Sequence, residues 1–387
     1  MSILIKNGRI LTMAQKNYER GDILIEGGKI KKIAEEIPSP EGAEIIDAEG
    51  MWVMPGIVDA HCHIGMWEDG VGFEGADGNE ETDPVTPHLR AIDGINPEDT
   101  SFREAREHGI TTVVTGPGSA NVVGGQFAAL KTYGRRVDDM IIKAPLAVKV
   151  ALGENPKRVY SEQKKSPSTR MATAAILRET LIQAQEYKRK LELGKEDPDK
   201  MPERDLGMEV LVKVLDRELP LKVHAHRADD ILTAIRIAKE FNVDITIDHC
   251  TEGHKITDFL LEDNARIIVG PLLTERSKVE LKNLSFKAPA ILSKAGLKVA
   301  IMSDHPVIPI QYLPVCASLA VREGMDEMEA LKAITINAAW VSGLDDRVGS
   351  LEEGKDADVV IFDGHPLDVR SRTRMVFIDG KLVFERE

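Results

Sequence analysis

The chain has 387 residues, of which 42% are hydrophobic and 29% charged, a composition typical of globular proteins with a large core. A net charge of −14 argues against binding to nucleic acid, because such binding requires clustered lysine and arginine. The apolar runs are shorter than the about 20 residues of a membrane span, and the three cysteines are too few and too scattered for a disulfide framework. We therefore expect a cytoplasmic protein without a membrane or nucleic-acid partner.

The first part of the chain, residues 1–53, predicts short strands joined by tight turns. It begins directly with a strand-like pattern and lacks the architecture of a signal peptide. Asn7-Gly8 and Gly27-Gly28 lie between alternating apolar runs, which is the pattern of β-hairpins. Both observations indicate a small β-rich unit at the N-terminus.

From about residue 54, strand-like runs alternate with helical periodicity, which predicts βα units with parallel strands. The predicted helices are Ala172–Leu193, Leu206–Asp216, Ile231–Phe241, Ala288–Ala295 and Glu327–Trp340. After residue 349 the strand pattern returns, with Asp379-Gly380 as a further turn. We predict an α/β protein in which a (β/α)8 TIM barrel, residues 54–348, carries a small β-sandwich built from residues 1–53 and 349–387.

Residues of metal-ligand type stand at the ends of the predicted strands. His61 and His63 close one apolar run and share one face of the strand, because side chains alternate. Two imidazoles on one face can bind a divalent metal, although His-x-His alone is a weak motif. Further ligand-type residues end three later strand-like runs: His224, His249 and Asp304. In a (β/α)8 barrel the strand ends meet at one mouth, so these residues on strands one, five, six and eight predict a site for zinc or a similar ion.

Four motifs give the chain a resemblance to a known family. They are GDILIEGGKI at 21–30, MPGIVDAHCH at 54–63, GITTV at 109–113 and GSLEEGKDADVV at 349–360. With these motifs the chain resembles the amidohydrolase superfamily of metal-dependent hydrolases, and in particular the imidazolonepropionase-related amidohydrolases. The resemblance spans the whole chain and implies a barrel flanked by a β-sandwich from both termini.

The resemblance also implies roles for individual residues. His61 and His63 would bind the more buried metal, His224 and His249 a second metal or the substrate, and Asp304 would act as proton shuttle. Metal binding can lower the pKa of water from 15.7 to about 7, and a nearby carboxylate can take the proton and pass it to the leaving nitrogen. We expect one or two divalent ions, zinc or a similar metal.

Two residues are candidates for the ligand that would bridge two metals. Binuclear relatives use a carboxylated lysine on strand four or a glutamate on strand three. Glu154 falls just past the end of a predicted strand, where ligands belong, whereas Lys149 lies in the middle of that strand and faces inward. The long segment before the next ligand favours strand three, so we predict Glu154 as the bridge, with Lys149 as the alternative. His226 shares a face with His224 and is predicted to contact the substrate.

These residues predict a metal-dependent amidohydrolase that cleaves a C–N bond in a small amide, cyclic amide or dipeptide-like substrate. One alternative is an aminohydrolase that deaminates a heterocycle with the same metal–carboxylate machinery. The other is a barrel that serves only as an assembly scaffold, and the intact set of ligand-type residues argues against it. The expected partner is a small-molecule substrate, and assembly into a homo-oligomer stays open.

Overall fold

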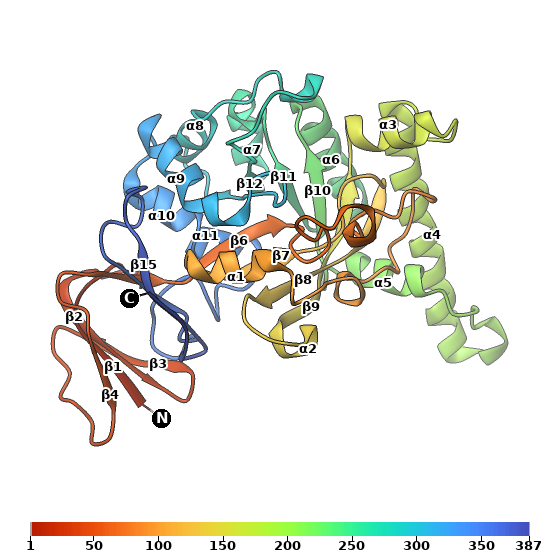
Figure 1. The fold of residues 1–387 in the computed structure, drawn as a ribbon. Helices are drawn as coiled ribbons and strands as arrows, with labels where there is room; N and C mark the ends of the chain where they lie inside the picture. Colours follow the sequence, from red (N-terminus) through yellow and green to blue (C-terminus); the bar gives the residue numbers. More distant parts are fainter. Residues whose placement is uncertain (1, 387) are drawn as a thin grey trace.

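The computed structural model describes residues 2–386 and contains two large sheets (Figure 1). The first is a mixed sheet of strands from both ends of the chain, with the order β16-β15-β14-β5-β1-β2-β3 and β4 paired with β1. Its strands are β1 (Ser2–Ile10), β2 (Tyr18–Glu26), β3 (Lys29–Ala34), β4 (Glu44–Asp47), β5 (Trp52–Pro55), β14 (Val359–Phe362), β15 (Thr373–Ile378) and β16 (Lys381–Glu385). The predicted Gly27-Gly28 turn joins β2 to β3. The turn predicted at Asn7-Gly8 is wrong, because both residues lie inside β1, where a bulge shifts its register with β2.

The second sheet is the barrel-shaped one that the sequence predicts, with eight strands in chain order. They are β6 (Ile57–Cys62), β7 (Ile110–Thr115), β8 (Val123–Lys131), β9 (Ile141–Ala151), β10 (Leu221–Ala225), β11 (Ile245–His249), β12 (Arg266–Val269) and β13 (Val299–Ile301). The barrel is nearly closed where its first and last strands end, because Asp304 N donates to the His61 carbonyl at 3.2 Å and His63 N to the His305 carbonyl at 2.8 Å.

Helices surround this barrel (Figure 1). They are α1 (Thr100–Glu107), α2 (Val137–Met140), α3 (Glu154–Glu162), α4 (Arg170–Glu196), α5 (Leu206–Leu215), α6 (Ala228–Phe241), α7 (Thr257–Glu262), α8 (Ala288–Lys294), α9 (Leu313–Arg322), α10 (Glu327–Ala333) and α11 (Ile336–Val341). Within residues 2–386, none of them is long and apolar enough to cross a bilayer. The helix predicted over Glu327–Trp340 is in fact two helices, α10 and α11, because the chain turns at Thr335.

One strand departs from the predicted parallel arrangement. β8 runs antiparallel to both β7 and β9, while the other neighbouring pairs are parallel. A parallel connection needs a crossover of about a dozen residues or more, and residues 116–122 between β7 and β8 are too few for one. The chain therefore doubles back, and β9, which the sequence analysis placed third, is the fourth strand of the sheet.

A buried group of charged residues joins the barrel to the terminal sheet. Lys131, at the end of β8, lies with its Nζ 3.1 Å from Asp356 Oδ2, 2.8 Å from Asp358 Oδ2 and 3.3 Å from Asp379 Oδ1. Asp356 also contacts Arg347 at 2.8 Å. Because Lys131, Asp356 and Asp358 are all buried, each charge depends on the others for compensation.

Replacing Lys131 with Met should lower the free energy of unfolding by about 3 kcal/mol, because two buried carboxylates would lose their main cation. Urea denaturation followed by circular dichroism would measure the loss. Lys190→Met, at an exposed position on α4, is the control and should change stability by less than about 0.5 kcal/mol. Equal stability of the two variants would show that the cluster does not hold the two sheets together.

Candidate metal centre

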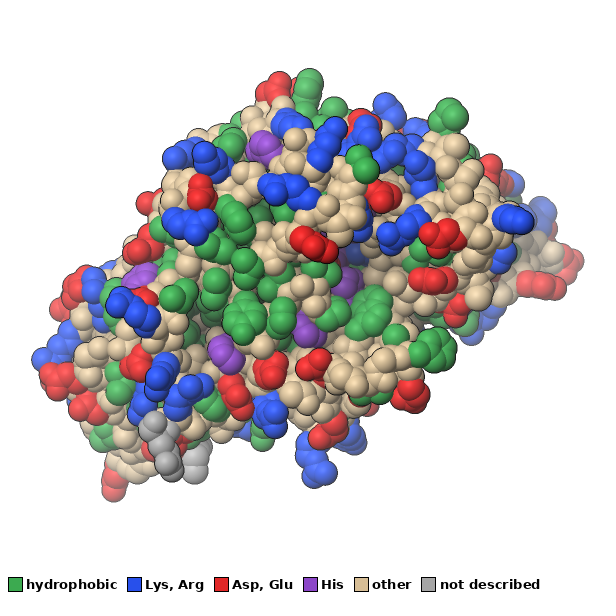
Figure 2. All heavy atoms as spheres, turned by 45° about the horizontal axis from the view of Figure 1, so that its top comes forward, with side chains coloured by type: hydrophobic (Ala, Val, Ile, Leu, Met, Phe, Trp, Pro, Cys, Tyr) green, Lys and Arg blue, Asp and Glu red, His purple; other side chains and the backbone are tan. Residues whose placement is uncertain are grey.

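The ends of β6, β10, β11 and β13 bring five ligand-type side chains to the mouth of the barrel. His61, His63, His224, His249 and Asp304 are all buried. Apart from His61, they line a cavity of about 270 Å³, together with His226, Trp67 and Lys278. Figure 2 shows histidine side chains among apolar side chains on one face of the molecule.

Local backbone geometry aims these side chains at the cavity. Gly56, just before β6, packs so tightly that a Cβ there would lie 1.9 Å from Thr111 Oγ1, so only glycine fits before the strand that carries His61. His249 has a φ of 73° and Asp304 a φ of 56°, a left-handed conformation that costs about 1–3 kcal/mol for residues other than glycine. Such strain is typical of functional sites.

His61, His63 and Asp304 form the first part of the centre. Asp304 Oδ1 lies 3.5 Å from His61 Nε2 and 3.3 Å from His63 Nε2. The Nδ1 atoms, on the side of each ring away from Asp304, also have partners. His61 Nδ1 is 2.7 Å from Asp248 Oδ2, and His63 Nδ1 donates to the Gly116 carbonyl at 2.7 Å. Partners of this kind fix the tautomer, so both Nε2 atoms present their lone pairs to the cavity.

His224, His226 and His249 form the second part. One ligand atom from each of them lies within 4.8 Å of the others, and His61, His249 and Asp304 meet the same limit. Neither ring nitrogen of His224 has a hydrogen-bond partner among residues 2–386. Buried polar atoms without a partner are costly, and a divalent ion would satisfy them. The donor set of imidazoles and a carboxylate therefore fits a divalent metal site typical of amidohydrolases.

Burial keeps the histidines neutral and able to bind a metal. It lowers the pKa of His61 to about 4 and that of His226 to about 3, and it holds the pKa values of His224 and His249 well below the ordinary value. Burial by itself would raise the pKa of Asp304, but the adjacent imidazoles of His61 and His63 hold that pKa well below its usual range. Asp304 is therefore an ionised carboxylate.

The two candidates for the bridging ligand occupy different places. Lys149, on β9, is completely buried, and its Nζ lies 3.4 Å from His61 Nε2. Burial lowers the pKa of Lys149 to about 8. Glu154 begins α3 at a half-buried position and, within the described chain, falls in neither of the two groups that could hold a metal. The structure thus brings Lys149 to the centre and leaves Glu154 at its edge.

Charged residues beneath the centre escaped the sequence analysis. Asp248 contacts His61 and also Lys222, whose Nζ is 3.2 Å from Asp248 Oδ2. The positive φ of His249 lets both Asp248 and His249 serve the centre, although side chains that follow one another in a strand normally point to opposite faces. A second such residue, Glu280, lies in an irregular loop after β12. A charged residue inside an apolar strand run was the available signal for Asp248, and no comparable signal marks Glu280.

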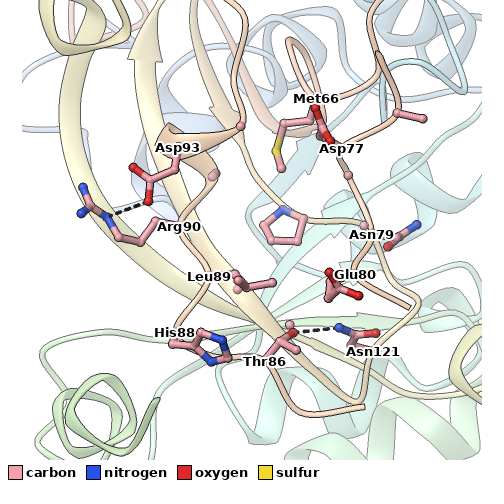
Figure 3. Close-up of a pocket in the computed structure, with 18 residues that line it drawn as sticks. Met66, Asp77, Asn79, Glu80, Thr86, His88, Leu89, Arg90, Asp93 and Asn121 are labelled. Carbon is pink, nitrogen blue, oxygen red and sulfur yellow. Dashed lines mark hydrogen bonds and ion pairs between the residues drawn. The ribbon is translucent and has the colours of Figure 1, made fainter. Parts of the chain in front are cut away.

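A second cavity of about 400 Å³ adjoins the metal pocket, and the two share Asn79 and Gly118 as lining residues. Figure 3 shows its walls, which come from the loops after β6 and β7. An ion pair of 3.7 Å joins Arg90 to Asp93 on one wall, and Asn121 Nδ2 donates to Thr86 Oγ1 at 2.8 Å on another. The barrel mouth therefore offers space beyond the metal centre itself.

The centre has counterparts in known proteins. The model described as Amidohydrolase family matches residues 52–383. The chain is 30% identical over 400 residues to amidohydrolase tasK of Hapsidospora irregularis, covering 94% of this chain but only 40% of tasK. It is 26% identical over 422 residues to the imidazolonepropionase of Thermoplasma volcanium, covering 98% of this chain and 97% of that protein. The crystal structure of an amidohydrolase from Thermotoga maritima MSB8 matches with a TM-score of 0.97 and 48% identity, over 99% of this chain and all of that one. The chain therefore belongs to the amidohydrolase family.

Proposed function

We propose that this chain hydrolyses the C–N bond of a small amide, cyclic amide or dipeptide-like substrate. The observation that carries the proposal is the buried group of His61, His63 and Asp304, in which one carboxylate oxygen faces two imidazole nitrogens at 3.5 and 3.3 Å. A divalent ion held there, zinc or a similar metal, would supply Lewis acidity and lower the pKa of a bound water. Proton transfer would be carried out by side chains of the protein.

Asp304 is the group that we expect to move the proton. Its Oδ1 accepts a proton from the attacking water and then returns it to the nitrogen that leaves when the C–N bond breaks. The pKa of Asp304 lies below its usual range, so the carboxylate is ionised and its oxygen is free to accept a proton. His63 and His61 flank this carboxylate, and the orientations of their rings are fixed by the Gly116 carbonyl and by Asp248.

We further propose that Lys149, rather than Glu154, supplies the carboxylate shared between two metal positions. The neutral amine of Lys149 would add to carbon dioxide and release one proton, which gives a carbamate. The pKa of about 8 leaves part of the amine neutral near physiological pH. The position of Nζ at 3.4 Å from His61 Nε2 supports the assignment.

The size of the site supports a small-molecule substrate. The metal pocket of about 270 Å³ suits a compact group, and the adjoining cavity of about 400 Å³ gives a longer substrate room to extend. Similarity to an imidazolonepropionase supports keeping cyclic amides among the candidates. The net charge of −14 supports a partner other than nucleic acid or an anionic membrane surface.

A substrate screen on zinc-loaded protein tests the proposal. N-acyl amino acids, dipeptides, lactams and amino-heterocycles would be offered, with released amine and released ammonia measured separately. Cleavage of an amide or lactam supports the proposed function. Ammonia from an amino-heterocycle would assign an aminohydrolase instead, and a metal-loaded protein inert to every class would favour the scaffold.

Metal content gives a test that needs no substrate. Replacing His61 and His63 together with Ala should remove at least one equivalent of divalent metal, because both Nε2 atoms face the centre. Elemental analysis of protein from zinc-supplemented cells would measure the loss. His108→Ala, whose Nδ1 bonds only the Glu104 carbonyl of its own helix, is the control and should keep the full content. Wild-type protein without zinc, and unable to take it up, would contradict the metal site.

A further inference from the structure

Lys278 is a cation at the metal pocket that the proposed function does not use. It lies in the loop after β12, directly before the 3-10 turn Val279–Leu281, and its side chain is 20% exposed. Within the described chain, Lys278 is the only lysine or arginine that lines this pocket, and Asp304 is the only carboxylate. A divalent ion bound at the centre would add further positive charge. The occupied pocket therefore favours a substrate that carries an anionic group.

Contacts on both sides of Lys278 fix its place in the loop. Before it, Arg276 Nη2 donates to the Leu284 carbonyl at 2.8 Å. After it, Glu280 is 1% exposed, and its Oε2 accepts a hydrogen bond from Glu154 N at 3.0 Å. The backbone at Lys278 is thus held beside the pocket, so little conformational freedom would be lost when a ligand binds there.

The ammonium group of Lys278 is available to a ligand. Its charged partner within residues 2–386 is Glu280 Oε1, at 3.7 Å, which is longer than a hydrogen bond. An ammonium has three N–H donors, and this one acts on the centre already. Burial chiefly, and next the charge of Lys278, lower the pKa of His226 to about 3.

The ammonium lies within reach of a small substrate bound at the centre. Glu280 Oε1 is 3.7 Å from Lys278 Nζ and also 3.7 Å from His226 Nε2, so both groups border the same oxygen atom. In an N-acyl amino acid or a dipeptide, only the amide nitrogen and one carbon separate the carbonyl under attack from the terminal carboxylate. A substrate with its carbonyl at the metal can therefore place this carboxylate at Lys278.

We propose that Lys278 binds a carboxylate of the substrate and so selects N-acyl amino acids or dipeptide-like compounds over neutral amides. A carboxylate and an ammonium in a partly buried pocket form a charge-assisted hydrogen bond, which is stronger than a neutral one. Lys278 would determine specificity and move no proton. The inference rests on the proposed function for the bond that is cleaved, but carboxylate binding can be measured without cleavage.

Binding of two unreactive probes to zinc-loaded protein tests the inference. 3-Phenylpropionate carries a carboxylate, and 3-phenylpropan-1-ol has a neutral hydroxyl group in its place. Isothermal titration calorimetry should show that Lys278→Met weakens binding of the carboxylate by about tenfold, the value of one charge-assisted hydrogen bond. Binding of the alcohol should not change. Zinc content, measured on each sample, should equal that of wild type.

Two further variants serve as controls. Lys282→Met removes an exposed lysine of the same loop and should bind both probes as wild type does. Lys278→Arg keeps the positive charge and should keep most of the affinity for the carboxylate. Neutralisation of Glu280 is the competing role for Lys278, and its loss would weaken both probes alike. Equal weakening of the two probes, or unchanged binding of the carboxylate by Lys278→Met, would overturn the proposal.

Kinetics place the carboxylate relative to the scissile bond. For N-acetyl-L-alanine, Lys278→Met should lower kcat/KM by about tenfold, mainly through KM, and for N-acetyl-L-alaninamide it should change neither constant. Succinamate and succinamide form the matched pair with the carboxylate on the acyl side. A loss confined to succinamate would overturn the selection of N-acyl amino acids. If wild-type protein hydrolyses none of these compounds or those of the wider screen, the proposed function fails, whereas the two probes still decide the role of Lys278.

Discussion

Replacing Asp304 with Asn should lower turnover by about 10²–10⁴-fold while the fold and most of the bound metal are retained. The amide has the shape of the carboxylate but cannot accept a proton at the oxygen that faces His61 and His63. The loss should therefore fall on kcat rather than on KM, since proton transfer occurs only in the reaction itself. Steady-state kinetics on a substrate found by screening, with metal content measured on the same samples, would check the result.

Asp138→Asn is the matched control for this experiment. Asp138 is exposed on α2, away from the barrel mouth, and its replacement should leave kcat unchanged. Near-parental turnover by Asp304→Asn, with metal still bound, would show that another group moves the proton. His226 and His249 would then be tested next, because both face the same cavity.

Lys149→Ala should lower metal-dependent activity by more than the 10–100-fold that is usual for a residue supporting a metal ligand. The reason is that the change would remove a ligand shared by two metal positions and leave a cavity beside His61 Nε2. Metal content and turnover would be measured before and after addition of acetate or propionate. These acids can occupy the space of the lost side chain and supply a carboxylate, so partial rescue is expected.

Glu154→Ala is the comparison that separates the two candidate bridges. Glu154 is half-buried at the start of α3, and its replacement should leave metal content near the wild-type value. A Glu154→Ala protein that loses metal, beside a Lys149→Ala protein that keeps it, would return the bridging role to Glu154. Carbon dioxide depletion during metal loading gives an independent check, because only a carbamate on Lys149 depends on it.

The sequence predicts the barrel and much of the centre, because strand ends leave a local pattern. An apolar run that closes on His, as at His61 or His249, places that residue at the barrel mouth once parallel strands are assumed. Part of the terminal sheet is predictable for the same reason, since the Gly27-Gly28 and Asp379-Gly380 turns are local, whereas Asn7-Gly8 lies inside β1. The reversed direction of β8 cannot be predicted in this way. It depends on the short connection between β7 and β8, and the composition of β8 itself is not distinctive.

Residues near the centre that do not lie at strand ends could not be predicted from such patterns. Glu280 comes from an irregular loop, where neither periodicity nor a turn motif indicates the direction of a side chain. Lys149 was judged by its place along one strand, whereas the role proposed for it depends on β9 being fourth in the sheet. The positions of both side chains depend on tertiary contacts, which a local stretch of sequence does not reveal.

The pairing of β14 with β5 connects the last strands of the chain to the segment that leads into β6 and the metal centre. Met54 pairs with Val360, and Gly56 N donates to the Asp358 carbonyl at 3.0 Å, directly before the strand that carries His61. A protein shortened to end before residue 349 would lose both the β14–β5 pairing and the hydrogen bond from Gly56 N just before β6. Shortened versions of the protein should therefore keep β14, because the strands from its two ends pair in one sheet.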